Sequence, residues 1–542
     1  MKSWITRMLV LALLGGSVAW FHRARQTRET RVAAATRNKT LLIGNSTEIE
    51  TLDCHLATGV PEHHVISALF EGLVAPAVDN PDADAPGAAL SWTHEAFTRW
   101  IFKLRPNGKW SDGTPVTAGD FAFAYQRMLT PETGSDYAPM LYPLKNGEAY
   151  NKGEVKDFTQ VGVKAVDDLT LELNLKSPTP YLPGLLKHYS WFGVPKHVVL
   201  KHGSISDRQN RWTKPQNIVS NGPFKLKEWR FTHYLAVDRN PHYWDAKAVK
   251  LNEVHFFPIS ADTAEERAFR DGQLHATYRV PLSRVPYYAS QKDGFYRSHR
   301  ALGVWFLRIN TTMKPLDDIR VRQALSLALD RQSIVQNVMR AGQEAAFGIT
   351  PPGCAEGYKT PNLMRYDVAR ARQLLAEAGY PNGKGFPRVE LLITQSGAAR
   401  ALSETLQEMW KKELGISVGV LSQDWQVYLD AMRKLTYGVA FAGWVGDYPD
   451  PTTFLGLWRT GDGNNNTGWG NPDYDRLYAE AEKTADYAER MNLLQKAESL
   501  MLEQGAVAPI YWHVNYYLQQ RGVLHFHSSL LEHRAYKAID LE

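Results

Sequence analysis

The stretch WIFKLRPNGKWSDGTPVTAGDFAFAYQRMLTP, residues 100–131, predicts the local fold of this chain. Residues 100–104 carry the alternation of a strand with one buried face. Turn formers follow at positions 106–108 (PNG) and 112–115 (DGTP). Thr117 then offers a capping hydroxyl, with Asp120 three residues on, ahead of an amphipathic segment. The stretch therefore predicts a strand, two turns and a capped helix that begins at Thr117.

The alternation of strands and helices continues through the C-terminal half. Amphipathic patterns predict helices over 319–339, 366–378, 399–414, 474–483 and 490–504, with strands over 389–394 and 417–421. Shorter segments predict strands over 41–44, 170–175, 235–238 and 254–257 and a helix over 65–73. Such alternation is typical of α/β domains. A chain of 542 residues is too long for one compact core, so we expect two or three domains.

The positive charge of the chain is concentrated at its N-terminus. The net charge is +5, but residues 1–40 hold eight lysines and arginines against a single glutamate. The rest of the chain has no basic excess, so we expect no nucleic-acid partner. Lys2 and Arg7 precede an apolar run over 8–21, which resembles an export signal with a cleavage site after Ala19. The basic stretch behind that run leaves an uncleaved anchor open, so we expect either the periplasm or the outer face of the cytoplasmic membrane.

The sequence lacks the common motifs of catalysis. It contains no GxSxG elbow, no GxxxxGK[ST] phosphate loop and no HExxH. His63 and His64 are adjacent, so on a helix they point about 100° apart and rarely share one ion. His525 and His527 could share one strand face, but a surface pair without function is the simpler interpretation. We therefore expect no enzyme, no cofactor and no bound metal.

Two carboxylates, Asp447 and Asp450, lie among aromatic residues in GWVGDYPDP, residues 443–451. Such a pair could serve a glycoside hydrolase as acid and nucleophile. Asp450, which precedes a proline, could instead turn the chain ahead of a helix. In a third interpretation one carboxylate binds a ligand cation between the walls of Trp444 and Tyr448. The pattern by itself leaves all three open.

Several segments, in order, resemble the family 5 extracellular solute-binding proteins, and most of all their periplasmic oligopeptide-binding members. Besides the opening stretch they are IETLDCHLATGVPEHHVISALFEGLV (49–74), VSNGPFKLKEW (219–229), RNPHYWD (239–245), DDIRVRQALSLALDRQSIV (317–335), TPPG (350–353) and AGWVGDYPDPTTFL (442–455). The resemblance runs from about residue 41 to the C-terminus.

The resemblance implies an α/β, two-lobed periplasmic binding protein fold of type II, with a hinge between the lobes and an additional third domain. It places the export signal or anchor with its linker at 1–39, a discontinuous lobe I at 40–70, 191–302 and 508–542, the extra domain at 71–190 and lobe II at 303–507. It implies a monomer that closes over oligopeptides or dipeptides and delivers them to an ABC permease. A non-peptide ligand (a metal chelate, haem, opine or sugar) is the alternative, and a glycoside hydrolase a remote one.

The resemblance also implies how a peptide would be held. Asp447 matches the aspartate that meets the peptide's α-ammonium group. The backbone groups of Val60, Gly443 and Val445 match those that pair with an extended peptide. Backbone pairing ignores side-chain identity, so we expect broad specificity.

Four further side chains match positions near the ligand in the family. Trp425 and Trp444 match aromatic residues that line side-chain pockets. Tyr137 and Asn221 match positions beside the bound peptide. We therefore add these four residues to the predicted ligand-binding site.

The sequence departs from the family pattern at several positions. Phe441 stands where the oligopeptide binders have an arginine, and Thr58 where they have a glutamate. The lost positive charge leaves recognition of the peptide's C-terminus, and hence the preferred length, open. Cys54 and Cys354 form no CxxC motif and could make one disulfide or none.

Overall fold

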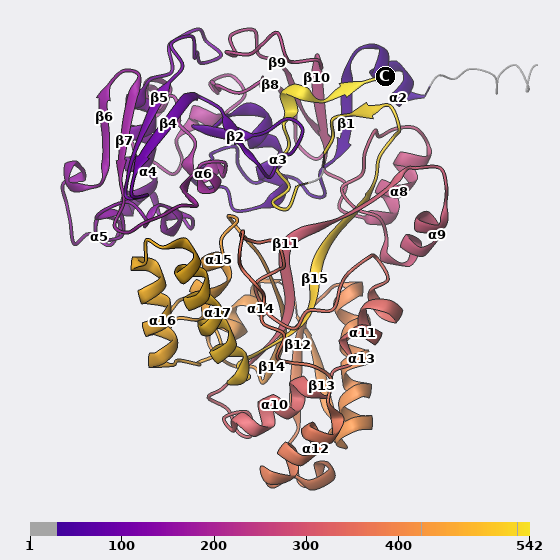
Figure 1. Cartoon of the computed structure of the whole chain (residues 1–542). Coiled ribbons are helices and arrows are strands. Elements are labelled where there is room, and N and C mark those ends of the chain that lie inside the picture. The colour runs from indigo at the N-terminus through magenta and orange to yellow at the C-terminus, as the bar shows by residue number, and fades with distance from the viewer. Residues whose placement is uncertain (1–29, 424, 528) are drawn as a thin grey trace, which may run out of the picture.

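The computed structural model describes residues 30–423, 425–527 and 529–542. The chain forms an upper and a lower body, which two long strands join (Figure 1). Most of the segment predicted as export signal or anchor, residues 1–29, lies outside the described residues. The end of that segment forms helix α2 (Arg31–Arg37), whose first turn Thr30 caps.

The upper body contains two four-stranded sheets. The first has the order β1-β10-β9-β8, and its strands are β1 (Thr40–Gly44), β10 (Glu253–Phe257), β9 (Tyr234–Arg239) and β8 (Phe224–Arg230). The second has the order β4-β5-β7-β6, and its strands are β4 (Ala89–Glu95), β5 (Arg99–Leu104), β7 (Thr170–Asn174) and β6 (Val163–Asp167). One continuous hydrophobic core runs through both sheets. The predicted division between lobe I and the extra domain thus separates two sheets that share a core.

The opening stretch folds as its sequence predicts. Strand β5 is followed by helix α4 (Ala118–Leu129), which packs against β6 and β7. The Thr117 backbone N–H and hydroxyl donate to the Asp120 carboxylate at 2.9 and 3.1 Å, which completes the capping box. Phe121 and Tyr125 then lie fully buried on the inner face of the helix.

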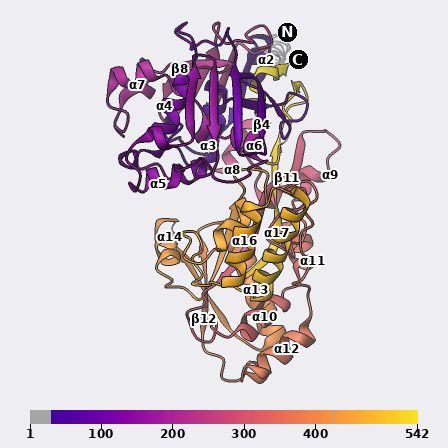
Figure 2. The ribbon, with the colours of Figure 1, turned by 60° about the vertical axis from the view of Figure 1, so that its left-hand side comes forward.

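The lower body is built on one five-stranded sheet with the order β13-β12-β14-β11-β15. Its strands are β13 (Val418–Gln423), β12 (Val389–Thr394), β14 (Val439–Val445), β11 (Tyr296–Ile309) and β15 (Val507–Leu518). Helices α10, α12 and α13 share a core with one face of the sheet, and α17 shares a core with the other. Figure 2 shows α16 and α17 side by side along this body. The lower body is therefore an α/β unit, as predicted.

Strands β11 and β15 connect the two bodies (Figure 1). They run antiparallel from the pair Tyr296 and Leu518 in the upper body to the pair Arg308 and Val507 in the lower one, and their register shifts after Arg300. The sequence analysis predicted neither strand. The predicted start of lobe II, residue 303, falls inside β11 at this irregularity.

Two predicted helices have different bounds in the structure. The helix predicted over 319–339 breaks after α10 (Ile319–Leu327), because the Asp330 carboxylate accepts the Ser333 N–H at 2.9 Å and starts a new turn. The helix predicted over 65–73 is α3 (Val60–Leu69).

The remaining elements are short strands and connecting helices. They are β2 (Val74–Pro76), β3 (Asp84–Pro86), β16 (Val523–Leu524), β17 (Asp540–Leu541), α5 (Gly147–Asn151), α6 (Leu182–Leu185), α7 (Lys196–His202), α8 (Asp262–Arg270), α9 (Val285–Ser290), α11 (Arg331–Ser333), α12 (Val368–Glu377), α13 (Gly397–Leu414), α14 (Trp425–Arg433), α15 (Thr452–Leu455), α16 (Pro472–Lys483) and α17 (Tyr487–Glu503).

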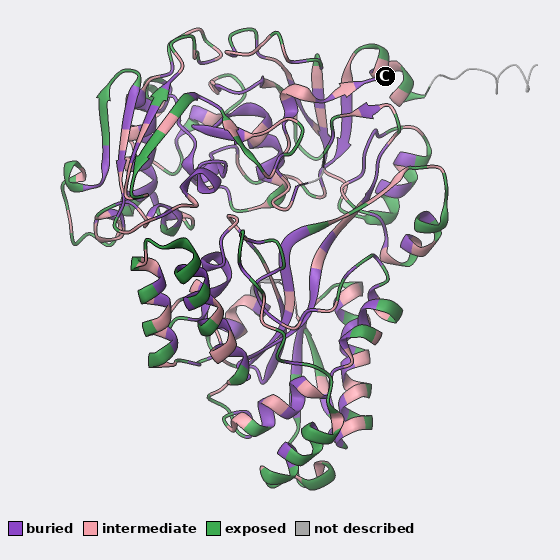
Figure 3. Cartoon of the chain, viewed as in Figure 1, coloured by how far each residue is buried: buried purple, intermediate pink, exposed green. Residues whose placement is uncertain are grey.

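Burial follows the layers of both bodies. Figure 3 shows the central strands buried and the outer faces of the helices exposed. Cys54 and Cys354 are both buried and free, so they form no disulfide with each other. Within the described ranges no helix combines the length and the apolar character that crossing a membrane requires.

Candidate ligand-binding site

Strand β14 carries two of the predicted backbone contacts, and its pairing with β11 sets their direction. At one end of the pairing the Gly446 N–H donates to the Leu302 carbonyl at 2.6 Å, and at the other the Asn310 N–H donates to the Gly438 carbonyl at 2.9 Å. Hydrogen-bonded and non-hydrogen-bonded positions alternate along an antiparallel pair. Gly443, and the residues two before and two after it, therefore direct their N–H and C=O groups away from β11.

The outward edge of β14 is only partly covered. Strand β12 pairs with it no further than Ala440. The next outward carbonyl, that of Phe441, accepts the Tyr428 hydroxyl at 2.8 Å. Beyond this point no strand within the described residues pairs with the outward groups of Gly443 and Val445. This edge can therefore accept an added strand.

A glycine is required at the centre of this edge. Gly443 lies opposite Trp305 of β11. A Cβ atom on Gly443 would lie 2.9 Å from the Trp305 indole ring, which is closer than packed atoms come. The indole ring in turn stacks on Phe441, with 5.1 Å between ring centroids. The aromatic ring therefore covers this face of β14 and fixes residue 443 as glycine.

Asp447 lies two residues beyond the end of β14, after Gly446. Its backbone N–H donates to the Thr453 hydroxyl at 3.0 Å. Across the described part of the chain, no hydrogen bond or ion pair reaches the Asp447 carboxylate. The side chain keeps partial solvent exposure, yet burial among protein atoms raises its pKa to about 7. An acidic group in this state gains from any cation that comes to lie beside it.

Aromatic side chains of the upper body face Asp447. Burial, and then the nearby Asp447 carboxylate, raise the pKa of Tyr137. Burial also raises the pKa of Tyr189, and the nearby Tyr137 and Asp447 raise it further. Ring centroids of Tyr137 and Tyr189 lie 5.9 Å apart, and the His188 ring lies 5.1 Å from Tyr137. The predicted residues Asp447 and Tyr137 therefore lie near enough across the two bodies for the Asp447 charge to act on the tyrosine.

Val60 lies on the same side of the upper body as these rings. It opens helix α3 and is 36% exposed. The backbone N–H groups of a first helical turn have no partner within the helix. His63, one turn further on, lies 5.8 Å from the Tyr189 ring, centroid to centroid. The start of α3 therefore lies beside the aromatic cluster of Tyr137, His188 and Tyr189.

The two bodies touch beside Asp447. Tyr181 of the upper body stacks on Tyr448 of the lower one, with 5.1 Å between ring centroids and 11° between planes. The Arg490 guanidinium lies 5.1 Å from the Tyr181 ring. This arginine also makes two bonds to the Asp450 carboxylate, of 2.6 and 2.7 Å, in a pair that is almost fully buried.

The role of Asp450 follows from these bonds. Its carboxylate is held by Arg490 and also accepts the Thr452 N–H at 3.0 Å ahead of α15. It is 1% exposed. A buried carboxylate in a two-point ion pair is not free to act as acid or nucleophile. The structure thus separates the two aspartates, since Asp450 organises the chain while Asp447 stays without a partner.

The other predicted side chains lie in different surroundings. Trp444 points to the opposite face of β14 from Gly443 and packs against a core inside the lower body. Asn221 is 5% exposed, and its amide exchanges bonds of 3.1 and 2.9 Å with the Glu71 backbone. Trp425 begins α14, but its side chain lies outside the described residues. For these three the ligand contact stays a prediction.

Of the aromatic residues around this site, the sequence analysis missed Tyr181, His188 and Tyr189. His188 and Tyr189 belong to the run HYSW, residues 188–191, whose density of rings was the available signal. Nothing in the sequence around Tyr181 or Arg490 indicates that they meet across the chain.

Comparison with known proteins identifies relatives over almost the whole chain. The sequence model of the family "Bacterial extracellular solute-binding proteins, family 5 Middle" matches residues 85–466. The periplasmic oligopeptide-binding protein OppA of Salmonella typhimurium is 37% identical over 488 residues, 88% of each chain. The probable deoxycholate-binding periplasmic protein YgiS of Escherichia coli is 32% identical, over 86% of this chain and 87% of its own.

Solved structures agree with these sequence matches. The murein tripeptide-binding protein MppA of Escherichia coli has a TM-score of 0.81 and 32% identity, over 93% of this chain and 98% of its own. Haemophilus influenzae OppA in complex with the peptide RPPGFSPFR has a TM-score of 0.80 and 30% identity, over 93% and 99%. The chain belongs to family 5 of the bacterial extracellular solute-binding proteins.

Proposed function

We propose that this protein binds peptides between its two bodies, outside the cytoplasm, and delivers them to an ABC permease in the membrane. The observation that carries the proposal is the Asp447 carboxylate, which has no hydrogen-bond or ion-pair partner among the described residues and lies beside an uncovered strand edge. Relatives described as oligopeptide-binding support the same function. The relatives from Salmonella typhimurium and Escherichia coli are periplasmic proteins, which supports the periplasm as the location.

Asp447 is the residue that we assign to the peptide's α-ammonium group. A charge-assisted hydrogen bond between ammonium and carboxylate is about twice as strong as a neutral one. Burial has already made the ionised form of Asp447 unfavourable, so a cation relieves that cost. Tyr137 and Tyr189 bring hydroxyl groups to the same place from the upper body.

The uncovered edge of β14 supplies the second part of the recognition. An extended peptide that pairs with Gly443 and Val445 gains main-chain hydrogen bonds whatever its side chains are. The same edge leads directly into Asp447, so the first residue of the peptide would lie at the carboxylate. Amino-terminus capture and strand addition are therefore contiguous along one segment of the lower body.

A non-peptide ligand remains the second candidate, because one relative is described as a probable deoxycholate-binding protein. Deoxycholate is an acid without an ammonium group, so its carboxylate would meet the charge of Asp447 unfavourably. The glycoside hydrolase interpretation loses its second carboxylate, since Asp450 is held by Arg490. Peptides fit the described site best.

Calorimetric titration of the ligand-stripped protein tests the proposal. Peptides of two to eight residues are titrated with free and with acetylated amino termini. We expect free peptides to bind and acetylation to weaken binding by ~10-fold or more, because a charge-assisted bond is worth about 1.5–3 kcal/mol. Asp447→Asn should weaken the binding of free peptides by the same factor. Asp473→Asn, on the exposed face of α16, should bind them like the wild type.

Two results would overturn the hypothesis that Asp447 holds a peptide by its amino terminus. Equal binding of free and acetylated peptides would remove Asp447 as the amino-terminus contact. Heat from deoxycholate or an opine, with none from any peptide, would replace the peptide by a non-peptide ligand.

A further inference from the structure

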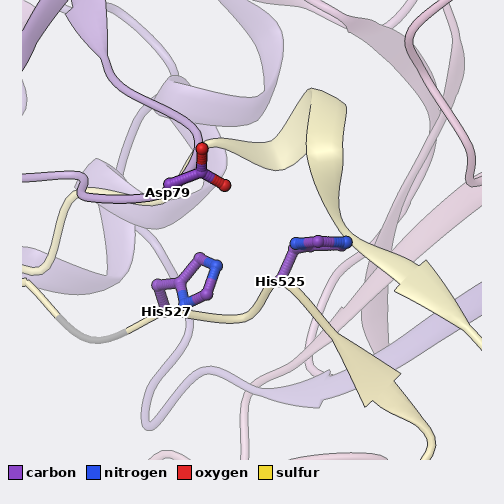
Figure 4. Close-up of side chains that lie close together, drawn as sticks. All are labelled: Asp79, His525 and His527. Atoms are coloured by element: carbon purple, nitrogen blue, oxygen red, sulfur yellow. The ribbon is translucent and has the colours of Figure 1, made fainter.

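A second constellation of polar side chains lies on the upper body, outside the peptide site. Three side chains, those of Asp79, His525 and His527, each offer one ligand atom, and these three atoms lie within 4.8 Å of one another. All three side chains are exposed. Figure 4 shows the carboxylate and the two imidazole rings grouped together. Asp79 comes from the loop between β2 and β3, whereas the histidines follow β16 near the C-terminus.

The buried residue between the histidines fixes the direction in which they point. Phe526 is 8% exposed, lies under the Arg534 guanidinium at 4.5 Å from its ring centroid, and packs edge-on against Tyr517 at 6.1 Å. His525 and His527, on either side of it, are exposed, so Phe526 anchors the segment while both imidazoles reach the surface. His525 also has a φ of +56°, a left-handed conformation that few residues other than glycine adopt.

A separate set of bonds brings Asp79 to the histidines. Asp82, three residues further along the same loop, accepts from the Ser529 hydroxyl and the Leu530 N–H, both at 2.8 Å. Its own carbonyl accepts the Lys187 ammonium at 2.7 Å. The loop is thus fastened to the C-terminal segment immediately beyond His527, and the place of Asp79 does not depend on a metal.

We propose that Asp79, His525 and His527 bind a divalent zinc ion. Two imidazoles and one carboxylate, with water in the remaining position, are a common zinc ligand set. Zinc holds its ligands at about 2.0–2.1 Å in a tetrahedron, which places the ligand atoms roughly 3.3 Å apart. Exposed side chains reach this spacing by small rotations, because no packed neighbour opposes them.

The sequence by itself favoured a surface histidine pair without function, and the third ligand changes that interpretation. His525 and His527 follow strand β16 and do not share a strand face, yet their ring centroids lie 5.8 Å apart. Two imidazoles by themselves make a weak site. The carboxylate that completes the set comes from the opposite end of the sequence, so only the fold reveals it. Zinc there would clamp the β2–β3 loop to the C-terminal segment and stabilise the upper body by mass action.

Zinc binding to the full-length chain, without an oligohistidine tag, tests this site. Competition with a chromophoric chelator should show a single tight equivalent that EDTA removes. Cobalt(II) added in place of zinc should give the visible absorption of a tetrahedral site. His525→Ala, His527→Ala and Asp79→Asn should each weaken zinc binding by roughly tenfold or more. Zinc should raise the melting temperature of the wild type but not of these three variants.

The control is His233→Ala, which removes an exposed histidine elsewhere on the upper body and should leave zinc binding unchanged. Peptide affinity should be the same in all these variants, because none of the substituted residues is among the proposed peptide contacts. Equal zinc binding by the wild type and the Asp79→Asn, His525→Ala, His527→Ala triple variant would overturn the proposal. So would a loss of zinc in His233→Ala equal to that in His527→Ala.

Discussion

At the scale of single residues, the ionisation of Asp447 makes peptide binding depend on pH. Burial raises its pKa to about 7, so the carboxylate takes up a proton as the pH falls through 7. The α-amino group of a peptide has a pKa of about 7.7–8.0 and loses its charge above that range. Both charges are present together only in a narrow interval near neutrality.

We therefore expect affinity to be greatest between about pH 7 and 8 and to fall by about tenfold per unit of pH well below 7. Calorimetry from pH 5 to 9 measures the profile. In Asp447→Asn the affinity should no longer fall below pH 7, and only the weak pH dependence that comes from the peptide's own amino group should stay. An unchanged affinity at pH 5 would show that this carboxylate does not hold the ligand's cation.

The sequence pattern could not assign different roles to Asp447 and Asp450. Both carboxylates lie among aromatic residues within four positions of each other, and three interpretations stayed open. What separates them is Arg490, which reaches Asp450 from helix α17. Long-range ion pairs of this kind leave no local signature, so the resemblance to a family, rather than spacing, singled out Asp447.

At the scale of elements, the packing of strand β14 against β11 requires Gly443, which leaves room for the Trp305 ring. Gly443→Ala would place a methyl group 2.9 Å from that ring. Overpacking of this kind costs about 1–3 kcal/mol, so we expect a lower melting temperature and weaker peptide binding. Gly463→Ala is the matched control, because no atom lies within 4 Å of the added methyl group. Equal stability of the two variants would contradict this packing.

The elements differ in how well the sequence predicted them. Helices α12 and α13 and strand β12 agree with their predicted ranges to within a few residues, because each shows one clear period. Strands β11, β14 and β15 were not predicted. They are buried on both faces inside the lower body, so apolar residues occur in runs rather than in alternation. The strands that form the site could therefore be located only in the folded structure.

At the scale of the whole molecule, strands β11 and β15 and the stack of Tyr181 on Tyr448 link the bodies. Strands β11 and β15 cross between them, with a register irregularity next to the crossing, where small changes in backbone angle could turn one body against the other. Tyr181 stacks on Tyr448, the residue that follows Asp447. A ligand that touches both bodies favours the closed arrangement by its differential contacts.

The tyrosine stack gives a test of closure that does not alter the proposed peptide contacts. An aromatic pair contributes about 0.5–1.5 kcal/mol beyond its buried area, so Tyr181→Ala should weaken peptide binding by roughly 2- to 12-fold. The loss should appear as faster dissociation, because the stack forms only when the bodies meet. Solution scattering should show a larger radius of gyration for the ligand-free variant than for the wild type. Tyr287→Ala, half exposed on α9, is the control. A variant that releases peptide at the wild-type rate would mean that this contact does not stabilise the closed form.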